Sequence, residues 1–345
     1  GVTPEWTYAF DNRPISQPWV FEHSDTSQFI LIQEQDHTIH GIHPSGKKLW
    51  SAVFAGRVVG DIQQMEDRSL YLVTDRGRFY RFNTDGKTQD GFSVPIAHEP
   101  TGNPTLINLG NQEIFFIPAG DHLLAYDGNG DVVDKWGDLA FEGQLIDAIY
   151  AVNNTLYVAT DDGSFYAFSA TAERINKVKI EDAKLSNSLA FLPSEQSAAM
   201  HIFAIDTAGN RYDVDMEKAA YTKRTSPWKA PFYATFKDVS DGAQPELILL
   251  GNKQISALAL TDSIIIFSYT FTQPISDKPQ FFKTSGNSYL IGVASRENGL
   301  IYILNDNGTP MDGFPIEAMP NFYYGKIDYN SSNYLLSVRK DKKLY

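Results

Sequence analysis

The segment TLYVATDDGSFYAF, residues 155–168, joins two apolar runs through a short acidic turn that contains glycine. The β-branched and aromatic residues on both sides favour β-strands, and Asp162-Gly163 can supply the positive φ that a tight hairpin needs. Nearly the same segment occurs as SLYLVTDRGRFYRF at residues 69–82. The sequence therefore predicts a β-hairpin that is repeated along the chain.

The apolar run before each turn recurs through the whole chain. Eight copies, spaced 41 to 45 residues apart, begin at Phe29, Leu70, Glu113, Leu156, His201, Glu246, Ser288 and Asn333. A β-rich repeat of roughly 40–50 residues is typical of a β-propeller blade. Within each copy, alternating apolar residues and regular turn residues indicate four antiparallel strands, named A to D in chain order. We therefore expect an all-β, eight-bladed β-propeller with four antiparallel strands per blade.

The two ends of the chain suggest how the ring closes. The last copy contains strands A, B and C and stops at Tyr345, whereas residues 5–10, EWTYAF, have no place in the first copy. We expect this N-terminal strand to complete the C-terminal blade, which would remove two exposed sheet edges from a single domain of residues 1–345. The leading Gly1 suggests a tag remnant on a fragment of a longer or processed protein, so a signal peptide, anchor or neighbouring domain could lie outside it.

Composition limits the class of partner. The chain has 29 Lys and Arg against 42 Asp and Glu, a net charge of −13, which repels phosphate backbones and anionic lipid surfaces and argues against nucleic acid. The absence of cysteine rules out disulfides, thiolate zinc sites and cysteine nucleophiles. No run of 18 apolar residues predicts a membrane span.

A glycine followed a few residues later by tryptophan recurs near strand D, at Gly46 and Trp50 and again at Gly130 and Trp136. Together with LYVATDDGSFYAF, this pattern resembles the PQQ-like repeat, most sharply over residues 71–82 and 157–168. That family includes quinoprotein alcohol dehydrogenases and the lipoprotein propeller of the bacterial outer-membrane assembly machinery. The resemblance implies a propeller in the bacterial cell envelope, periplasmic or extracellular. The quinone-binding members carry a vicinal disulfide, which a chain without cysteine cannot form.

Two groups of residues are candidate metal sites. Asp127, Asn129, Asp131 and Asp134 have the alternating oxygen ligands that calcium prefers, although the same spacing also suits a plain C–D turn, which we favour. His37, His40 and His43 are not expected to converge, because residues three apart on a strand point to opposite faces. We therefore expect no metal or other cofactor, with calcium as the weak alternative.

The sequence contains no recognisable catalytic motif. Loops on a rigid scaffold often carry binding residues, so we expect the face that bears the B–C turns and D–A connections to bind a protein partner. The candidates are Asp75, Arg76, Asp161, Asp162, Arg296 and Glu297, and the two arginines are expected to matter most. The hypothesis is a non-catalytic interaction scaffold of open oligomeric state. A small-molecule or carbohydrate-binding propeller, a remote quinoprotein-like enzyme using the central funnel, and a rigid spacer remain alternatives.

Overall fold

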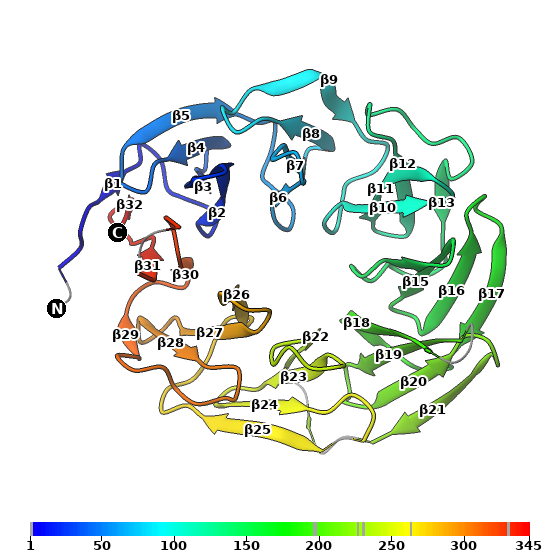
Figure 1. Cartoon of the computed structure of the whole chain (residues 1–345). Helices are drawn as coiled ribbons and strands as arrows, with labels where there is room; N and C mark the ends of the chain where they lie inside the picture. The colour runs from blue at the N-terminus through cyan, green and yellow to red at the C-terminus, as the bar shows by residue number, and fades with distance from the viewer. Residues whose placement is uncertain (1–2, 196–198, 226–227, 230–231, 263, 330–331) are drawn as a thin grey trace.

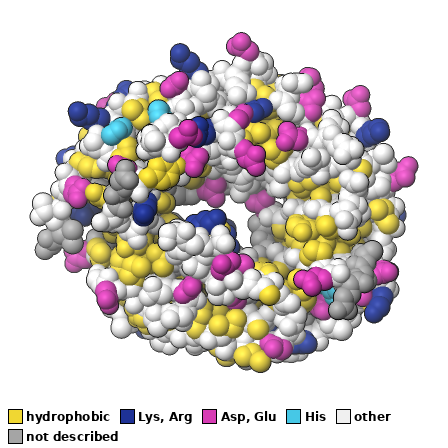
Figure 2. Space-filling model, in the orientation of Figure 1, with side chains coloured by type: hydrophobic (Ala, Val, Ile, Leu, Met, Phe, Trp, Pro, Cys, Tyr) yellow, Lys and Arg dark blue, Asp and Glu magenta, His cyan; other side chains and the backbone are white. Residues whose placement is uncertain are grey.

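The strands form a ring around a central opening in the computed structural model, which describes residues 3–195, 199–225, 228–229, 232–262, 264–329 and 332–345 (Figure 1). Figure 2 shows that the opening persists when all side chains are drawn, with basic and acidic groups at its rim. Seven four-stranded antiparallel sheets, or blades, follow one another around the ring. In each blade the first strand lies nearest the opening and the fourth lies at the outer rim (Figure 1).

The first four blades contain β2 (Trp19–Ser24), β3 (Ser27–Gln33), β4 (Thr38–Ile42) and β5 (Lys48–Val53); β6 (Gln63–Gln64), β7 (Leu70–Thr74), β8 (Arg78–Phe82) and β9 (Thr88–Pro95); β10 (Thr105–Leu109), β11 (Gln112–Ala119), β12 (His122–Tyr126) and β13 (Asp138–Ala140); and β14 (Tyr150–Val152), β15 (Thr155–Thr160), β16 (Ser164–Ser169) and β17 (Arg174–Lys179). The other three contain β18 (Leu185–Pro193), β19 (Met200–Asp206), β20 (Arg211–Asp215) and β21 (Ala220–Arg224); β22 (Tyr233–Lys237), β23 (Glu246–Leu250), β24 (Gln254–Leu258) and β25 (Ile265–Thr270); and β26 (Gln280–Lys283), β27 (Tyr289–Ser295), β28 (Leu300–Leu304) and β29 (Ile316–Glu317).

The two middle strands of each blade carry the core. All five residues of β7 are buried, whereas all five residues of β21, an outermost strand, are exposed. Middle strands such as β7 and β23 are almost entirely apolar because a neighbouring blade covers each face, whereas β20, RYDVD, keeps polar residues at its half-buried positions. Aromatic rings make much of this contact: Phe79 of β8 lies edge-on to Phe115 of β11 in the next blade, with ring centroids 5.1 Å apart.

The glycine–tryptophan pattern is a contact between blades. A Cβ atom at Gly86, where φ is +77°, would lie 2.4 Å from the ring of Trp50, which comes from β5 of the preceding blade. Trp50 also donates a hydrogen bond from Nε1 to the carbonyl oxygen of Thr84 at 2.8 Å. Trp6 covers Gly46 in the same manner. The outer strand of one blade thus docks on the C–D turn of the next, and only glycine leaves room for the ring.

The expected number of complete blades is wrong, because the structure has seven rather than eight. The remaining strands form two two-stranded sheets between the seventh blade and the first, β30 (Phe322–Gly325) with β31 (Tyr334–Ser337), and β1 (Tyr8–Ala9) with β32 (Lys343–Leu344). β1 and β32 have two residues each, and the two pairs are joined by the bridge from Val338 to Leu344 and by backbone hydrogen bonds between Ser337 and Tyr345. Strands this short do not extend the ladder into a further four-stranded sheet.

The two ends of the chain meet at this place (Figure 1). Tyr8 of β1 is paired with Leu344 of β32, and the Tyr8 hydroxyl lies 2.8 Å from Nδ1 of His40 in the first blade. His40 in turn lies 2.8 Å from the Glu34 carboxylate, and burial lowers the pKa of this imidazole. Phe10, Leu344 and their neighbours form a buried apolar cluster. Polar and apolar contacts therefore both hold the first strand in place.

Within the described part of the chain, no helix is long and apolar enough to cross a membrane.

Candidate functional site

The B–C turns and the D–A connections lie on one face of the ring and are hydrogen-bonded to each other. Asp75 in the B–C turn of the second blade donates its N–H to the carbonyl oxygen of Arg57 and accepts the N–H of Arg57 on Oδ1, each at 2.9 Å. Asp161 makes the same pair of bonds with Gln144 in the fourth blade, at 2.8 and 2.9 Å. These aspartates therefore fix the loops of this face.

The structure does not bring the six predicted binding residues together. Asp75 and Arg76 lie on the second blade, Asp161 and Asp162 on the fourth, and Arg296 and Glu297 on the seventh, at separate positions around the ring (Figure 1). Arg76 and Glu297 are exposed. Their role in binding stays a prediction.

Asp162 is held within its own hairpin. Its carboxylate accepts the Thr160 hydroxyl at 2.5 Å and the Lys179 ammonium at 3.0 Å. Burial alone would raise the pKa of Asp162, but the hydrogen bonds from Thr160, Lys179 and Ser164 together hold it below its ordinary value. The arrangement keeps this carboxylate ionised and its hairpin rigid.

The unequal contacts of Asp75 and Arg76 give a first prediction. We expect Asp75→Ala to lower the free energy of unfolding by about 1–2 kcal/mol, because the exposed N–H of Arg57 loses a charged acceptor. Arg76→Ala should change it by less than about 0.5 kcal/mol, as an exposed surface substitution does. Urea unfolding of both variants measures the difference, and equal losses would contradict the structural role of Asp75.

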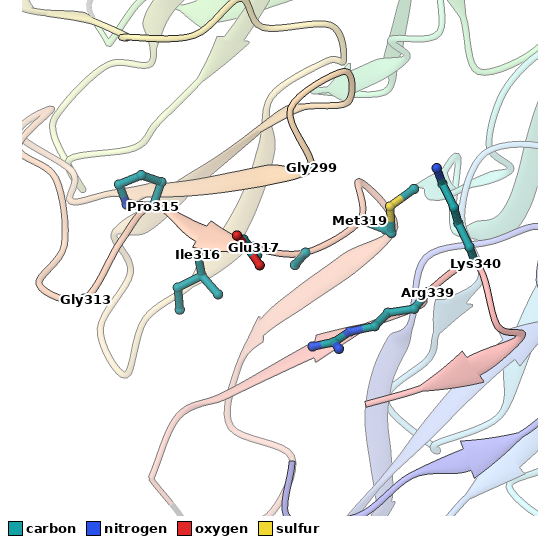
Figure 3. A pocket seen from close by; sticks show the side chains of 9 residues that line it. Gly299, Gly313, Pro315, Ile316, Glu317, Met319, Arg339 and Lys340 are labelled. Atoms are coloured by element: carbon teal, nitrogen blue, oxygen red, sulfur yellow. The ribbon is translucent and has the colours of Figure 1, made fainter. Parts of the chain in front are cut away.

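A basic depression lies on this face where the ring closes. A cavity of about 530 Å³ is lined by the basic residues Arg13, Arg296, Arg339, Lys340 and Lys342, together with Pro14, Met319, Pro320, Asn321 and Val338. A second cavity of about 730 Å³ shares Met319, Arg339 and Lys340 with it and adds Ile316, Glu317 and others from β29 and its neighbouring turns (Figure 3). We call the two adjoining cavities the closure groove.

The basic side chains of the closure groove come from segments that are distant in the sequence. Arg13 follows β1, Arg296 follows β27, and Arg339 follows β31. The Arg296 guanidinium is paired with the Asp277 carboxylate at 2.9 Å, yet its side chain remains 54% exposed. The Arg339 guanidinium lies 4.2 Å from the centre of the Tyr345 ring, a cation–π contact that holds it while leaving it exposed. The groove thus presents fixed positive charge beside apolar surface.

A third cavity, of about 590 Å³, lies along the innermost strands. Trp19, Phe21 and Phe281 line it together with Lys237, Lys283, Asp61, Gln280 and eight further residues. Some of its polar groups already make hydrogen bonds within the protein: Asp61 Oδ1 accepts hydrogen bonds from Gln17 at 2.6 Å and from Trp19 Nε1 at 3.0 Å. The central opening is therefore concave and mixed in character.

A chain of hydrogen bonds passes from blade to blade beside this opening. Asp61 donates its N–H to Asn103 Oδ1 at 2.7 Å, Asn103 donates its N–H to Asp147 Oδ2 at 3.3 Å, and Asp147 donates its N–H to Asn187 Oδ1 at 2.8 Å. Burial raises the pKa of Asp147. Equivalent positions in four successive blades are thereby joined, which stiffens the inner wall.

The four weak calcium candidates, Asp127, Asn129, Asp131 and Asp134, lie at the C–D turn of the third blade and just after it. Asp127 Oδ1 accepts the N–H groups of Asn129 and Asp131 at 2.8 and 3.0 Å. Asn83 caps the C–D turn of the second blade with the same pair of bonds, and Asp206 caps the B–C turn of the fifth blade in this way. The carboxylate thus stabilises its own turn, and calcium binding there stays a prediction.

Sequence reasoning missed Arg13, Arg339 and Lys342 in the closure groove, and also a cluster of His98, His122 and Asp138 on the third blade. Neither set has a local motif. The pairing expected between the two termini could have placed Arg13 near Arg339, because each lies close to one of the paired strands.

The ring of antiparallel blades defines the protein as a β-propeller. No model of a known protein family matches the sequence, and no curated protein matches it. Solved structures do: BamB from Moraxella catarrhalis has a TM-score of 0.57 and 14% identity over 98% of this chain and 96% of its own. Sqt1 from Saccharomyces cerevisiae has a TM-score of 0.64 and 12% identity over 98% and 97%. BBS1N in complex with ARL6DN has a TM-score of 0.55 and 11% identity over 88% and 93%. At these identities the likeness concerns the fold.

Proposed function

We propose that this chain is a non-catalytic protein-interaction scaffold whose closure groove takes an acidic segment of a partner protein. The observation that carries the proposal is the convergence of five basic side chains on one cavity of a chain whose net charge is −13. The basic groove attracts an acidic segment of a partner and repels a basic one. The remainder of the chain is acidic and has the opposite preference. Arginine beside apolar surface is also favoured at interface hot spots.

The cell envelope of a bacterium, periplasmic or extracellular, is the compartment we propose. Support comes from the resemblance to the PQQ-like repeat and from the shared fold with BamB, the outer-membrane assembly lipoprotein propeller. BBS1N, another propeller with this fold, was solved in complex with ARL6DN, which illustrates that such rings hold partner proteins.

The test uses a fluorescein-labelled octaglutamate peptide and fluorescence anisotropy. The wild-type chain should bind the peptide at low salt and release it as salt is added, because the contact is electrostatic. The double variant R339E/K340E should bind at least about tenfold more weakly, a change of about 1.4 kcal/mol. K47E/K48E is the matched control, since Lys47 and Lys48 are exposed on the C–D hairpin of the first blade and carry the same change of charge.

Equal weakening by both double variants would show that only net charge matters and would overturn the assignment to the closure groove. Tighter binding of a single-stranded oligonucleotide than of the peptide would overturn the choice of a protein partner. Retention of binding by the control alone supports the proposal.

The cavity along the inner strands supports a second candidate, a small-molecule or carbohydrate ligand. Trp19, Phe21 and Phe281 offer apolar surface beside Lys237 and Asp61, a combination that suits a ligand with an apolar face and polar edges. A remote quinoprotein-like activity would use the same opening. Phe281→Ala should weaken a ligand held there and leave peptide binding at the closure groove unchanged.

A further inference from the structure

Two imidazoles and a carboxylate meet on the third blade, away from the closure groove. His98 lies in the connection between β9 and β10, His122 begins β12, and Asp138 begins β13. One possible ligand atom from each residue lies within 4.8 Å of the others. Among the residues that the structure describes, it is the one such cluster of three. The fold therefore gathers three metal-ligating groups from three separate segments.

The sheet register accounts for two of the three positions. His122 is paired with Ala140, and Leu124 with Asp138, so that His122 and Asp138 lie diagonally across neighbouring strands. Residues two apart on a strand point to the same face, which places the imidazole and the carboxylate on one side of the sheet. The incoming loop then lays the His98 ring on the His122 ring, with centroids 3.8 Å apart and planes 17° apart.

A fourth residue fixes the orientation of His122. Its Nδ1 lies 2.7 Å from Asp121 Oδ1, and because an ionised carboxylate can only accept, Nδ1 must carry the proton. Nε2 is then the nitrogen with the free lone pair, and it faces Asp138 Oδ1 at 3.8 Å. Metal-ligating histidines usually donate their other nitrogen to a carboxylate or a carbonyl in this way. The tautomer that a metal requires is therefore already selected.

His98 approaches Asp138 from the other side. Its Nε2 lies 2.6 Å from Asp138 Oδ2, so in the absence of metal this nitrogen donates a hydrogen bond to the carboxylate. A tetrahedral ion with bonds of about 2.0–2.1 Å keeps its ligands roughly 3.3 Å apart. The Nε2 atoms of His98 and His122 lie 2.6 and 3.8 Å from the two oxygens of Asp138, distances that bracket this spacing, and the three side chains are 24% to 44% exposed. The exposure also leaves access for an ion from solvent and for water.

The charges around the cluster favour a cation. Asp138 and Asp121 both face the imidazoles, and burial raises the pKa of Tyr126 nearby, with the charge of Asp138 adding to the rise. Neutral imidazole is the form that binds metal. Imidazole ligands suit zinc, copper and nickel, whereas calcium and magnesium prefer sites made of oxygen.

We propose that His98, His122 and Asp138 bind a divalent transition-metal ion of the zinc class, with water in the remaining position. The ion takes the place of the proton on Nε2 of His98, which passes through solvent to Nδ1 of the same ring, and it joins the loop after the second blade to the outer half of the third. Because the ligating nitrogens must be free of protons, metal binding competes with protons for these nitrogens.

The chain contains its own comparison site. His201 on β19 lies 2.7 Å from Asp213 through Nδ1 and 3.9 Å from Asp215 through Nε2. It therefore has two carboxylates but no second imidazole. Removing His201 changes a surface histidine of similar exposure, 33% against 24% for His122, without touching the proposed ligands.

The full chain is treated with a chelator and then titrated with zinc alone in a calorimeter. A parallel titration uses cobalt, whose visible absorption indicates whether the ion has tetrahedral nitrogen and oxygen ligands. The wild type and His201→Asn should each bind one zinc ion with equal affinity. His122→Asn and Asp138→Asn should lose tight binding, and Asp121→Asn should bind about 10–100-fold more weakly because the imidazole is no longer oriented. Circular dichroism verifies folding, and His98→Gln, at a half-buried loop position, replaces any variant that does not fold.

Unchanged zinc affinity in His122→Asn and Asp138→Asn would overturn the proposal. An equal loss of zinc affinity in His201→Asn would also overturn it, because zinc would then bind to surface histidines in general. Displacement of zinc by calcium at a similar concentration would overturn it as well.

Discussion

Replacing Gly86 with alanine is expected to destabilise the protein by about 2–5 kcal/mol. Part of this loss, about 1–2 kcal/mol, comes from forcing an L-residue into the left-handed region, since φ at Gly86 is +77°. The rest, about 1–3 kcal/mol, comes from the new methyl group, which would lie 2.4 Å from the Trp50 ring and must displace it. Urea unfolding measured by tryptophan fluorescence gives the loss and also reports the environment of Trp50.

Gly91 is the matched control for this variant. Its φ is +75°, but no atom lies within 4 Å of the position that a Cβ would take. Gly91→Ala should therefore lose only the backbone part, about 1–2 kcal/mol. If the two variants were equally stable, the contact between Trp50 and Gly86 would contribute nothing, and the account of blade docking given above would be wrong.

Phe10→Ala is expected to have the second large effect, a loss of about 3–5 kcal/mol, as is usual when a buried phenylalanine is truncated. Phe10 is 6% exposed and packs with Ile30, Leu336 and Leu344, so the change leaves a cavity where the ends of the chain meet. The His40 ring lies edge-on to Phe10, with centroids 5.3 Å apart, and would lose that contact too. Thermal unfolding measures the loss, and limited proteolysis shows whether the N-terminal segment is released first.

Val53→Ala serves as the control for Phe10→Ala, because Val53 is 74% exposed on β5 and its truncation should cost less than about 0.5 kcal/mol. A Phe10→Ala variant as stable as the control would mean that the first strand adds nothing to the ring.

The two middle strands of each blade could be predicted from the sequence, whereas the extent of the innermost and outermost strands could not. The apolar run at Leu156 and the following aromatic run are β15 and β16, because strands buried on both faces are apolar throughout. The innermost strand of the same blade covers only Tyr150–Val152, although the apolar segment before it begins at Leu145, which forms one isolated bridge. It borders the central opening, so fewer of its residues are required to pair.

The count of complete blades failed for a related reason. Repeat spacing indicates how often a segment occurs, but not whether each copy has enough paired residues to form a full sheet. Tyr8 and Ala9 are the only residues of EWTYAF that form a strand. The site was harder still, since Arg13, Arg296 and Arg339 converge through the closure of the ring and not through any spacing along the chain.

The meeting of the two ends has a consequence for chain entropy. Lys342 Nζ donates to the carbonyl oxygen of Asp11 at 3.4 Å across a separation of 331 residues. The cost of closing a loop rises with the logarithm of its length and reaches about 5 kcal/mol for a loop of this size, before any constant is added. Contacts between neighbouring blades close far shorter loops and therefore cost less chain entropy. The blades can assemble one after another before the two ends of the chain pair. We therefore expect the contact between the two ends to form last during folding.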